Sequence, residues 1–477
     1  MTSPVARATA AVAVLVALGA CAPAPSTPAV GATSASATPR PTLADPVAAA
    51  EALARELHPP GASALPSGRT DYRRPGDVGA DLELLVSRRP DVVRPLVLPH
   101  RTPLGAPVTG VELGRADDFA PVFVLLGGHH AGEWPSVDVV VEFAAELAQL
   151  HGRDQRVTDL LDRVRVVVVP VVNPDGYAVS RDLEVEGKRR SCRVDDAREE
   201  VTRAECADAA NADFGVDLNR NYGVNWGGSG SSGVRTQEDY RGTGPFSEPE
   251  TRNVRDLVST HQVTGLVSVH TYAALTVRPP YQRATSATAD EPLYARVGEV
   301  MAAANGYPSV PGGDLYEAAG TAVEWAYHTT GGLGFDVELG GDSSHDPFPT
   351  AVVGPYAGFR ESVLVAVEAA ADPANHAVLT GTAPEGAVLT ARKSFDQTTG
   401  RDGTAFTSDL TSTATAHGAF TWHVNPSVRP AFDGGTHDEA WTVTCARPHG
   451  EVLQETRVTA GRGTTTGVDL GECAADW

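Results

Sequence analysis

The feature that most constrains this chain is the continuous β-branched run 164-VRVVVVPVV-172. An apolar run of this length without polar alternation is typical of a strand that is buried on both faces of a sheet. Shorter strand-like runs occur at 121-PVFVLL-126, 265-GLVSVH-270 and 333-LGFDVEL-339. Helical periodicity lies between and after these runs, at residues 136–150, 247–261, 290–305 and 351–372. Alternating strands and helices predict an α/β fold, in which a mixed, largely parallel sheet is covered by helices on both faces.

Local signals also predict where two of these helices begin and end. Ser247 and Glu250 have the spacing of a capping box, with an early proline, at the start of the helix at 247–261. Gly306 directly follows the helical pattern at 290–305 and is expected to end that helix.

The texture of the sequence changes after about residue 372. Residues 376–477 are rich in Thr, Val and Gly, with short alternating runs such as 419-AFTWHV-424 and 440-AWTVTC-445. Short alternating strands predict a C-terminal all-β domain, an antiparallel sandwich, attached to the α/β domain at 72–372.

The first residues read as a targeting segment. Arg7 precedes the apolar run 9-TAAVAVLVALGA-20, which is too short to span a bilayer and is typical of a signal peptide. Its end, 18-LGAC-21, resembles the lipobox of bacterial lipoproteins, which implies cleavage after residue 20 and lipid modification of Cys21. The alternative is an ordinary secretory signal at residues 1–21. Residues 22–46 are rich in Pro, Ala, Ser and Thr and predict a flexible tether, and a short helix is expected at 47–57.

The remaining four cysteines form two local pairs, Cys192 with Cys206 and Cys445 with Cys473. Export permits disulfides, and two closed pairs would leave no free thiol, so two disulfides are predicted. The alternative is buried free cysteines. The net charge of −22 argues against a nucleic-acid or anionic-membrane surface.

Candidate metal ligands lie near the ends of the expected strands. In 127-GGHHAGEWPS-136, His130 and Glu133 are close enough to share one metal, and His270 ends the strand at 265–270. A catalytic zinc site takes three protein ligands and leaves one position for water. Ligands of open α/β sheets bind at the carboxyl ends of the strands, where His130, His270 and Glu338 all fall. Taken one by one, these residues could instead be ordinary surface or packed side chains.

Further short stretches follow in a fixed order. They are 130-HAGEW-134, 173-NPDGY-177, 215-GVDLNRNY-222, 240-YRGTGPFSEPET-251, 268-SVHTY-272 and 335-FDVEL-339. Together they resemble the zinc carboxypeptidases of the pancreatic carboxypeptidase A type, peptidase family M14, over roughly residues 72–372.

The resemblance implies one Zn²⁺ per chain, held by His130, Glu133 and His270. It implies that Asp217 hydrogen-bonds a ligand histidine, a contact that orients the ring and tunes metal affinity. Glu338 matches the catalytic glutamate, the general base that takes a proton from the attacking water and passes it to the leaving amine.

The same resemblance assigns residues to the substrate. Asn219 and Arg220 match the pair that binds the terminal carboxylate, which a guanidinium can grip through two hydrogen bonds. Tyr316 matches the mobile tyrosine that closes over the substrate, and Val323 falls where the family lines the floor of the side-chain pocket.

The oxyanion-binding arginine is less directly matched, because 186-EGKRRSCR-193 departs from the family pattern. Ungapped counting gives Lys188, and Arg190 is a further alternative. Arg189 is preferred, since a one-residue shift restores the pattern and a guanidinium fork suits a developing oxyanion better than an ammonium.

Asp336 lies two residues before Glu338 on one strand, so both side chains face the same side. Its carboxylate could pair with a C-terminal Lys or Arg of the substrate, in contrast to the apolar floor that Val323 suggests. Alternatively, Asp336 supports a nearby arginine.

The sequence therefore predicts an exported, lipid-anchored, monomeric zinc metallocarboxypeptidase that removes single C-terminal residues from peptides with a free carboxylate. A cell-wall muropeptide amidase with the same zinc chemistry is the enzymatic alternative. A catalytically inactive surface binding protein is the alternative from another class.

Overall fold

The computed structural model describes residues 62–283, 287–401, 403–432, 434–475 and 477, all within one compact unit. The predicted signal peptide, Cys21, the tether and the helix expected at 47–57 lie outside the described residues. No helix in the described part of the chain combines the length and the apolar character that a membrane span requires.

The central sheet is mixed, as the sequence predicts, and has the strand order β1-β2-β4-β3-β5-β8-β6-β7. Its middle is parallel, because β3 pairs in parallel with β4 and β5, and β5 with β8. The β1-β2-β4 side is antiparallel, and β6 runs antiparallel to β8 and parallel to β7. The strands are β1 (Val93–Val97), β2 (Thr109–Leu113), β3 (Val122–Leu126), β4 (Arg165–Val169), β5 (Val263–Thr271), β6 (Leu275–Arg278), β7 (Ser309–Pro311) and β8 (Leu333–Leu339).

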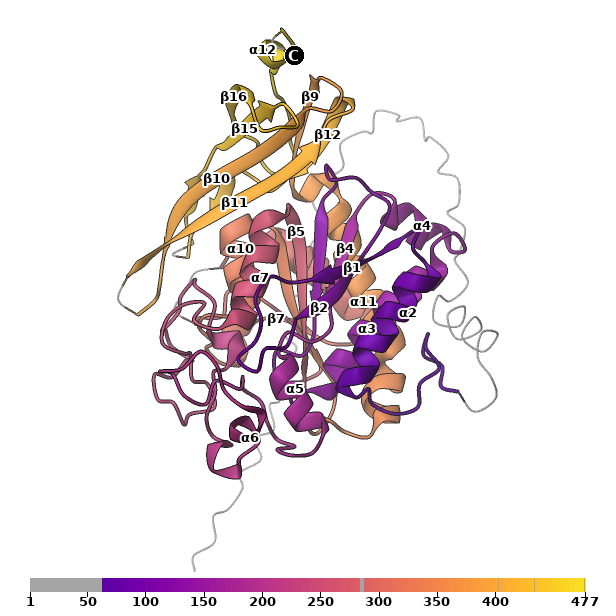
Figure 1. Ribbon diagram of the computed structural model, residues 1–477, viewed down its shortest axis with the longest axis vertical. Coiled ribbons are helices and arrows are strands. Elements are labelled where there is room, and N and C mark those ends of the chain that lie inside the picture. Colours follow the sequence, from indigo (N-terminus) through magenta and orange to yellow (C-terminus); the bar gives the residue numbers. More distant parts are fainter. Residues whose placement is uncertain (1–61, 284–286, 402, 433, 476) are drawn as a thin grey trace, which may run out of the picture. The chain divides into compact units, whose positions relative to one another are not determined.

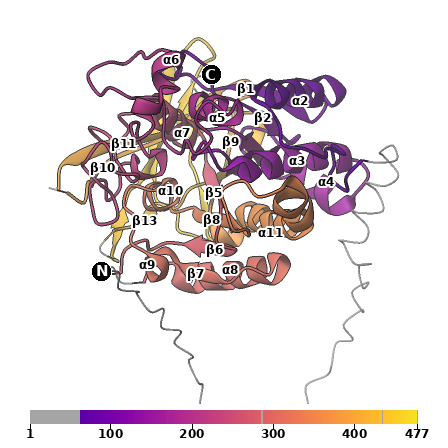
Figure 2. The same ribbon diagram turned by 90° about the horizontal axis from the view of Figure 1, so that it is seen from below.

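Helices cover both faces of this sheet (Figures 1 and 2). Successive residues of β3 show why: Leu125 belongs to one hydrophobic cluster, and its neighbours Val124 and Leu126 belong to the other. The Leu125 side packs on α2 (Pro75–Arg88), α3 (Trp134–Leu150), α4 (Gln155–Leu161), α8 (Glu291–Asn305) and α11 (Gly354–Ala371). The opposite side packs on α7 (Pro249–Thr260) and α10 (Ala322–Thr330). Shorter helices are α5 (Pro174–Arg181), α6 (Arg203–Cys206), α9 (Gly312–Leu315) and α12 (Gly471–Ala475).

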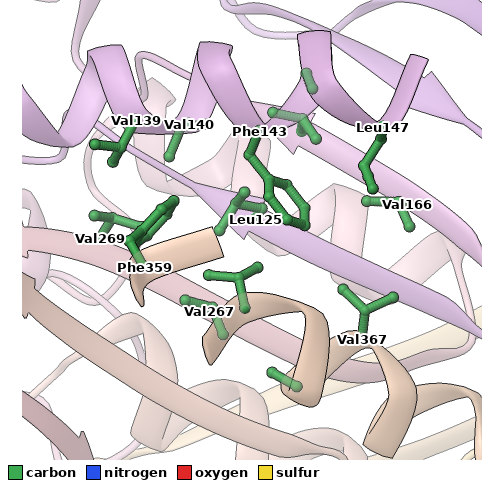
Figure 3. Packing of buried hydrophobic residues seen from close by; sticks show 14 of the residues in the cluster. Leu125, Val139, Val140, Phe143, Leu147, Val166, Val267, Val269, Phe359 and Val367 are labelled. Atoms are coloured by element: carbon green, nitrogen blue, oxygen red, sulfur yellow. The ribbon is translucent and has the colours of Figure 1, made fainter. Parts of the chain in front are cut away.

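Figure 3 shows the first of these layers from close by. Phe143 of α3 and Phe359 of α11 project toward the strands, beside Leu125. A buried side chain of this size contributes about 1.5–3 kcal/mol relative to an exposed one. The layer therefore holds rigid the strand ends from which the site residues come.

The predicted capping box is wrong. Helix α7 begins at Pro249, its N-cap residue is Glu248, and no side chain caps it. The Ser247 hydroxyl is instead engaged by Asn221 and donates to Glu248. Glu250 is turned into the interior, where burial raises its pKa well above the usual value. The other signal is confirmed, since Gly306 caps α8 with a φ of 75°.

The C-terminal residues form strands, as predicted. They make a four-stranded sheet in the order β11-β10-β15-β16, a three-stranded sheet β12-β9-β17 and a β13-β14 ladder. Side chains from both larger sheets, among them Trp422 and Trp441, share one hydrophobic cluster. The fully antiparallel expectation is wrong at one place, because β17 pairs in parallel with β9. The strands are β9 (Ala377–Ala383), β10 (Val388–Thr398), β11 (Ala405–Thr415), β12 (Gly418–Val424), β13 (Val428–Pro430), β14 (Thr436–Asp438), β15 (Trp441–Ala446), β16 (Val452–Val458) and β17 (Thr465–Gly467).

Both predicted disulfides are present, Cys192–Cys206 and Cys445–Cys473. Disulfides of this kind fit a protein of an oxidising, extracytoplasmic compartment.

Candidate active site

Three ligand-type side chains meet at the carboxyl ends of β3 and β5. The His130 Nδ1 atom lies 2.7 Å from Glu133 Oε1 and 3.2 Å from His270 Nδ1, and His270 Nδ1 lies 3.1 Å from Glu133 Oε2. All three residues are buried. Ligand atoms of a tetrahedral zinc ion, each about 2.0–2.2 Å from the metal, lie roughly 3.3 Å apart. The spacing and the two-nitrogen, one-carboxylate donor set therefore fit Zn²⁺.

Each histidine has its outer ring nitrogen held by an oxygen. His130 Nε2 lies 3.2 Å from Asp217 Oδ1, and His270 Nε2 lies 2.9 Å from the Ser268 hydroxyl. These contacts favour the tautomer in which Nε2 carries the proton and Nδ1 offers its lone pair to a metal. Although burial opposes ionisation, Arg189 and His130 hold the pKa of the Asp217 carboxyl well below its usual value.

Arg189 lies against the metal-ligand group, whereas its two neighbours point elsewhere. Its guanidinium is 3.2 Å from Asp217 Oδ2 and 3.4 Å from Glu133 Oε1. Lys188 is buried and donates to the Phe214 carbonyl, and Arg190 donates to the Arg235 and Gln237 carbonyls. Of the three cations that the sequence left open, the structure places Arg189 in the cavity wall.

Asn219 and Arg220 lie on a short 3₁₀ turn, Leu218–Arg220, whose N-cap is Asp217. The Asp217 carboxylate accepts the Asn219 backbone N–H at 2.9 Å, which ties this turn to the metal-ligand group. Arg220 donates from Nε to the Gly230 carbonyl at 2.9 Å and from Nη1 to the Asn219 carbonyl at 2.8 Å. Two backbone acceptors therefore fix the guanidinium, and Asn219 and Arg220 both line the cavity.

Glu338 lies beside His270, because the two residues are register partners on the adjacent strands β5 and β8. Burial raises the pKa of its carboxyl to about 7, with His270 opposing and the Glu133 and Asp336 carboxylates adding to the rise. A carboxyl with a pKa near neutrality suits general-base catalysis, since it can both accept and return a proton.

These residues surround one cavity of about 330 Å³. Tyr316 stands at its wall with 56% of its surface exposed, and its ring centroid lies 6.0 Å from the Arg220 guanidinium carbon. The cavity thus brings together a metal-ligand group, a carboxylate base and two arginines.

The sequence model of the zinc carboxypeptidases, Peptidase_M14, matches residues 78–356. The chain belongs to this family.

Curated relatives include pig carboxypeptidase A1 (Sus scrofa), 27% identical over 268 residues, and bovine carboxypeptidase B (Bos taurus), 27% identical over 266 residues. Each match covers 54% of this chain and 60% of the relative, so the chain spans about 60% of the length of these relatives. The C-terminal sheets lie beyond the residues that the family model matches.

Solved structures support the fold. Bovine thrombin-activatable fibrinolysis inhibitor, in complex with a tick carboxypeptidase inhibitor, has a TM-score of 0.53 at 23% identity. The match covers 63% of this chain and 98% of that one. Carboxypeptidase A from Helicoverpa armigera has a TM-score of 0.53 at 22% identity and covers 69% of this chain and 80% of that one.

Val323 lies behind the cavity wall. Among the described residues, the cavity wall includes Thr321 and Ala318 but not Val323. Val323, on α10, is fully buried in the core, where its side chain packs on Gly334. Val323 thus supports the cavity wall from behind, and its role at the floor of the side-chain pocket stays a prediction.

Asp336 does line the cavity, and its partner is a tyrosine that the sequence reading missed. Asp336 Oδ2 accepts a 2.5 Å hydrogen bond from the Tyr281 hydroxyl. Its other oxygen, Oδ1, is buried without a hydrogen-bond partner among the described residues and lies 3.7 Å from His270 Nε2. No hydrogen bond or ion pair joins Asp336 to an arginine in the described chain, but the charge of Arg220 acts on its carboxyl and favours its ionised form. No local motif pointed to Tyr281, which is recognisable only by what it meets in space, whereas Ser268 lies in the quoted stretch 268-SVHTY-272 but had been given no role.

Proposed function

We propose that this chain is a zinc-dependent metallocarboxypeptidase that hydrolyses the C-terminal peptide bond of peptides and releases single amino acids. The observation that carries the proposal is the arrangement of Arg220, Asn219 and Glu338 around the same cavity as the metal-ligand group. A fixed guanidinium beside a hydrolytic centre suits a substrate that ends in a carboxylate.

Each residue has a role in this reaction. His130, Glu133 and His270 would hold the zinc, which would supply Lewis-acid chemistry when bound. Glu338 accepts a proton from the attacking water and returns it to the leaving amine. Arg189, in the cavity wall, stabilises the charge that develops on the carbonyl oxygen.

Substrate binding uses two further residues of the cavity wall, Asn219 and Arg220. Asn219 and Arg220 hold the terminal carboxylate and so position the last peptide bond over the metal-ligand group. Tyr316 is exposed and within reach of the Arg220 guanidinium, which suits a side chain that covers the bound residue.

We further propose that the enzyme prefers C-terminal residues with a cationic side chain. The support is the buried Asp336 carboxylate, whose Oδ1 atom has no hydrogen-bond partner in the described chain. A buried acceptor without a donor costs free energy, and an ammonium or guanidinium group of the substrate would supply the donor.

We propose an extracytoplasmic location with a lipid anchor at Cys21, and a monomer that needs no partner chain. The two disulfides support export, and the residues around Cys21 support the anchor. The net charge of −22 supports attachment through lipid rather than through an electrostatic surface.

The first test is metal content. Wild-type protein should bind one zinc per chain, and His270→Ala should lose zinc and activity together. His376→Ala is the matched control, because His376 is a buried histidine near the C-terminal sheets whose ring contacts His423. Full activity in a zinc-free His270→Ala protein would contradict the proposal.

The second test offers one peptide as free acid and as C-terminal amide. The free acid should be cleaved and the amide almost untouched, and Arg220→Ala should lower kcat/KM on the acid by roughly 30- to 1000-fold, because a charge-assisted contact is worth about 2–4 kcal/mol. Equal cleavage of both forms would refute the carboxypeptidase and favour a muropeptide amidase. Zinc binding without cleavage of either form would favour an inactive binding protein.

A further inference from the structure

The orientation of the Arg220 guanidinium depends on a neighbouring loop, which a distant segment of the chain contacts. Arg220 Nε donates to the carbonyl of Gly230, in the loop of residues 223–230. This loop is tightly packed: Gly230 has a φ of +79°, and a methyl group there would lie 1.8 Å from the Glu317 carbonyl oxygen. The position of the Gly230 carbonyl, and with it the direction of the guanidinium, is therefore set by whatever fixes this loop.

The outer side of the loop is in contact with the hairpin formed by β10 and β11. The Gly400 N–H donates to the Trp226 carbonyl at 3.1 Å. The Phe406 ring lies against Gly223, where a methyl group would be 2.5 Å from its Cζ atom, and against Phe246 with a ring-centroid distance of 6.0 Å. The two strands pair along their whole length, and β11 lies beside α7 (Figure 1). The hairpin thus reaches from the C-terminal sheets to the loop that carries the partner of Arg220.

Other contacts anchor the C-terminal sheets away from this loop. Gln262 donates to the Ser412 hydroxyl at 2.7 Å, and Arg462 pairs with Asp290 at 2.8 Å. These anchors do not involve residues 223–230, so the contacts near Gly400 are not needed merely to attach the sheets. The hairpin end can therefore be perturbed while the attachment stays in place.

We propose that the β10–β11 hairpin is a positioning element for the substrate: it fixes loop 223–230 and thereby holds Arg220 in the geometry that receives the terminal carboxylate. This inference rests on the proposed role of Arg220. It assigns the C-terminal sheets a part in substrate binding, carried by Gly400 and Phe406 as positioning residues. Arg220 meets the carboxylate before and during the reaction, so a displaced loop should weaken ground-state and transition-state binding alike.

The test uses the same substitution, glycine to alanine, at two positions of the C-terminal region. In Gly400→Ala, the new methyl group would lie 2.0 Å from Asn225 Oδ1 and 3.0 Å from the Asn225 carbonyl oxygen, which pushes the hairpin and the loop apart. In Gly467→Ala, in β17, the methyl group meets nothing within 4 Å, and neither glycine has a positive φ. Gly467→Ala is therefore the matched control.

Gly400→Ala should raise KM for a free-acid peptide about tenfold with kcat changed less than threefold and with zinc retained, whereas Gly467→Ala should behave as wild type. Phe406→Ala should show the same split, and serves if Gly400→Ala does not fold. A folded Gly400→Ala or Phe406→Ala protein with the KM of the wild type would overturn the inference. An equal fall of kcat in Gly400→Ala and in Gly467→Ala would also overturn it. Failure of the proposed function is distinct, because the wild type itself would then cleave the amide as well as the acid.

Discussion

Replacing Asp336 with asparagine tests the proposed preference for cationic C-terminal residues. Asparagine keeps the shape and can still accept the Tyr281 hydroxyl bond, so the main change is the loss of one negative charge. A buried hydrogen bond to a charged group contributes about 1.5–3 kcal/mol, which corresponds to roughly a 10- to 150-fold change in an equilibrium or rate constant. Asp336→Asn should therefore lower kcat/KM by roughly that factor on peptides ending in Lys or Arg.

Peptides ending in apolar residues should change less than about threefold, because they place no charge near Asp336. The assay compares kcat/KM on one peptide series that differs only in its last residue. Glu238→Gln is the matched control: Glu238 also lines the cavity, but its side chain is 81% exposed, so water screens it. An equal loss on all substrates would refute the reasoning and indicate that Asp336 acts by orienting His270, which lies 3.7 Å away.

Three further predictions concern the rest of the chain. Burial lowers the pKa of Lys393 to about 7. Between pH 7 and about 10.5 the unfolded chain therefore binds more protons at this residue than the folded chain does. The free energy of unfolding should rise with pH over this range, by at most about 5 kcal/mol. Lys393→Met should remove this rise and increase Tm at pH 7, and an unchanged pH dependence of unfolding would contradict it. The double variant Cys192→Ser, Cys206→Ser removes a disulfide with a sequence separation of 14. Its free energy of unfolding, measured with urea, should fall by about 3 kcal/mol, and an unchanged value would refute this prediction. Cys21→Ser should abolish incorporation of a labelled lipid precursor and membrane partition, whereas equal labelling of both proteins would disprove the anchor.

The parts of the fold that follow from short-range patterns were predictable. The run around Val166 is apolar on both faces because helices cover both sides of the sheet, and this requirement acts on every residue of the strand. Gly306 ends α8 because glycine adopts a positive φ at no steric cost, and that preference is local. The meeting of His130, Glu133 and His270 was predictable, because their motifs lie at strand ends and the strand ends of a parallel sheet meet in space.

The errors have a different origin, since each depends on partners far along the chain. Ser247 fails as a cap because Asn221, 26 residues away, engages its hydroxyl. Val323 is packed in the core, and the nearby residues that line the cavity are Thr321 and Ala318. Tyr281 carries no motif at all, and its place in the cavity wall and its 2.5 Å contact with Asp336 appear only in the structure. Local patterns predict elements, but they do not tell which side chain a distant segment will meet.

The site explains why Asp217, Asn219 and Arg220 lie so close together in the sequence, in 217-DLNR-220. One carboxylate, that of Asp217, accepts from the Asn219 backbone and contacts His130 through Oδ1, and it pairs with Arg189 through Oδ2. As the N-cap of the turn Leu218–Arg220, it also fixes where Asn219 and Arg220 begin. A single buried anion therefore links the metal ligand, the cation proposed to face the oxyanion and the residues proposed to hold the terminal carboxylate. Since a 3₁₀ turn advances only about 2 Å per residue, the carboxylate-binding pair must follow Asp217 directly in sequence to stay within reach of the same cavity.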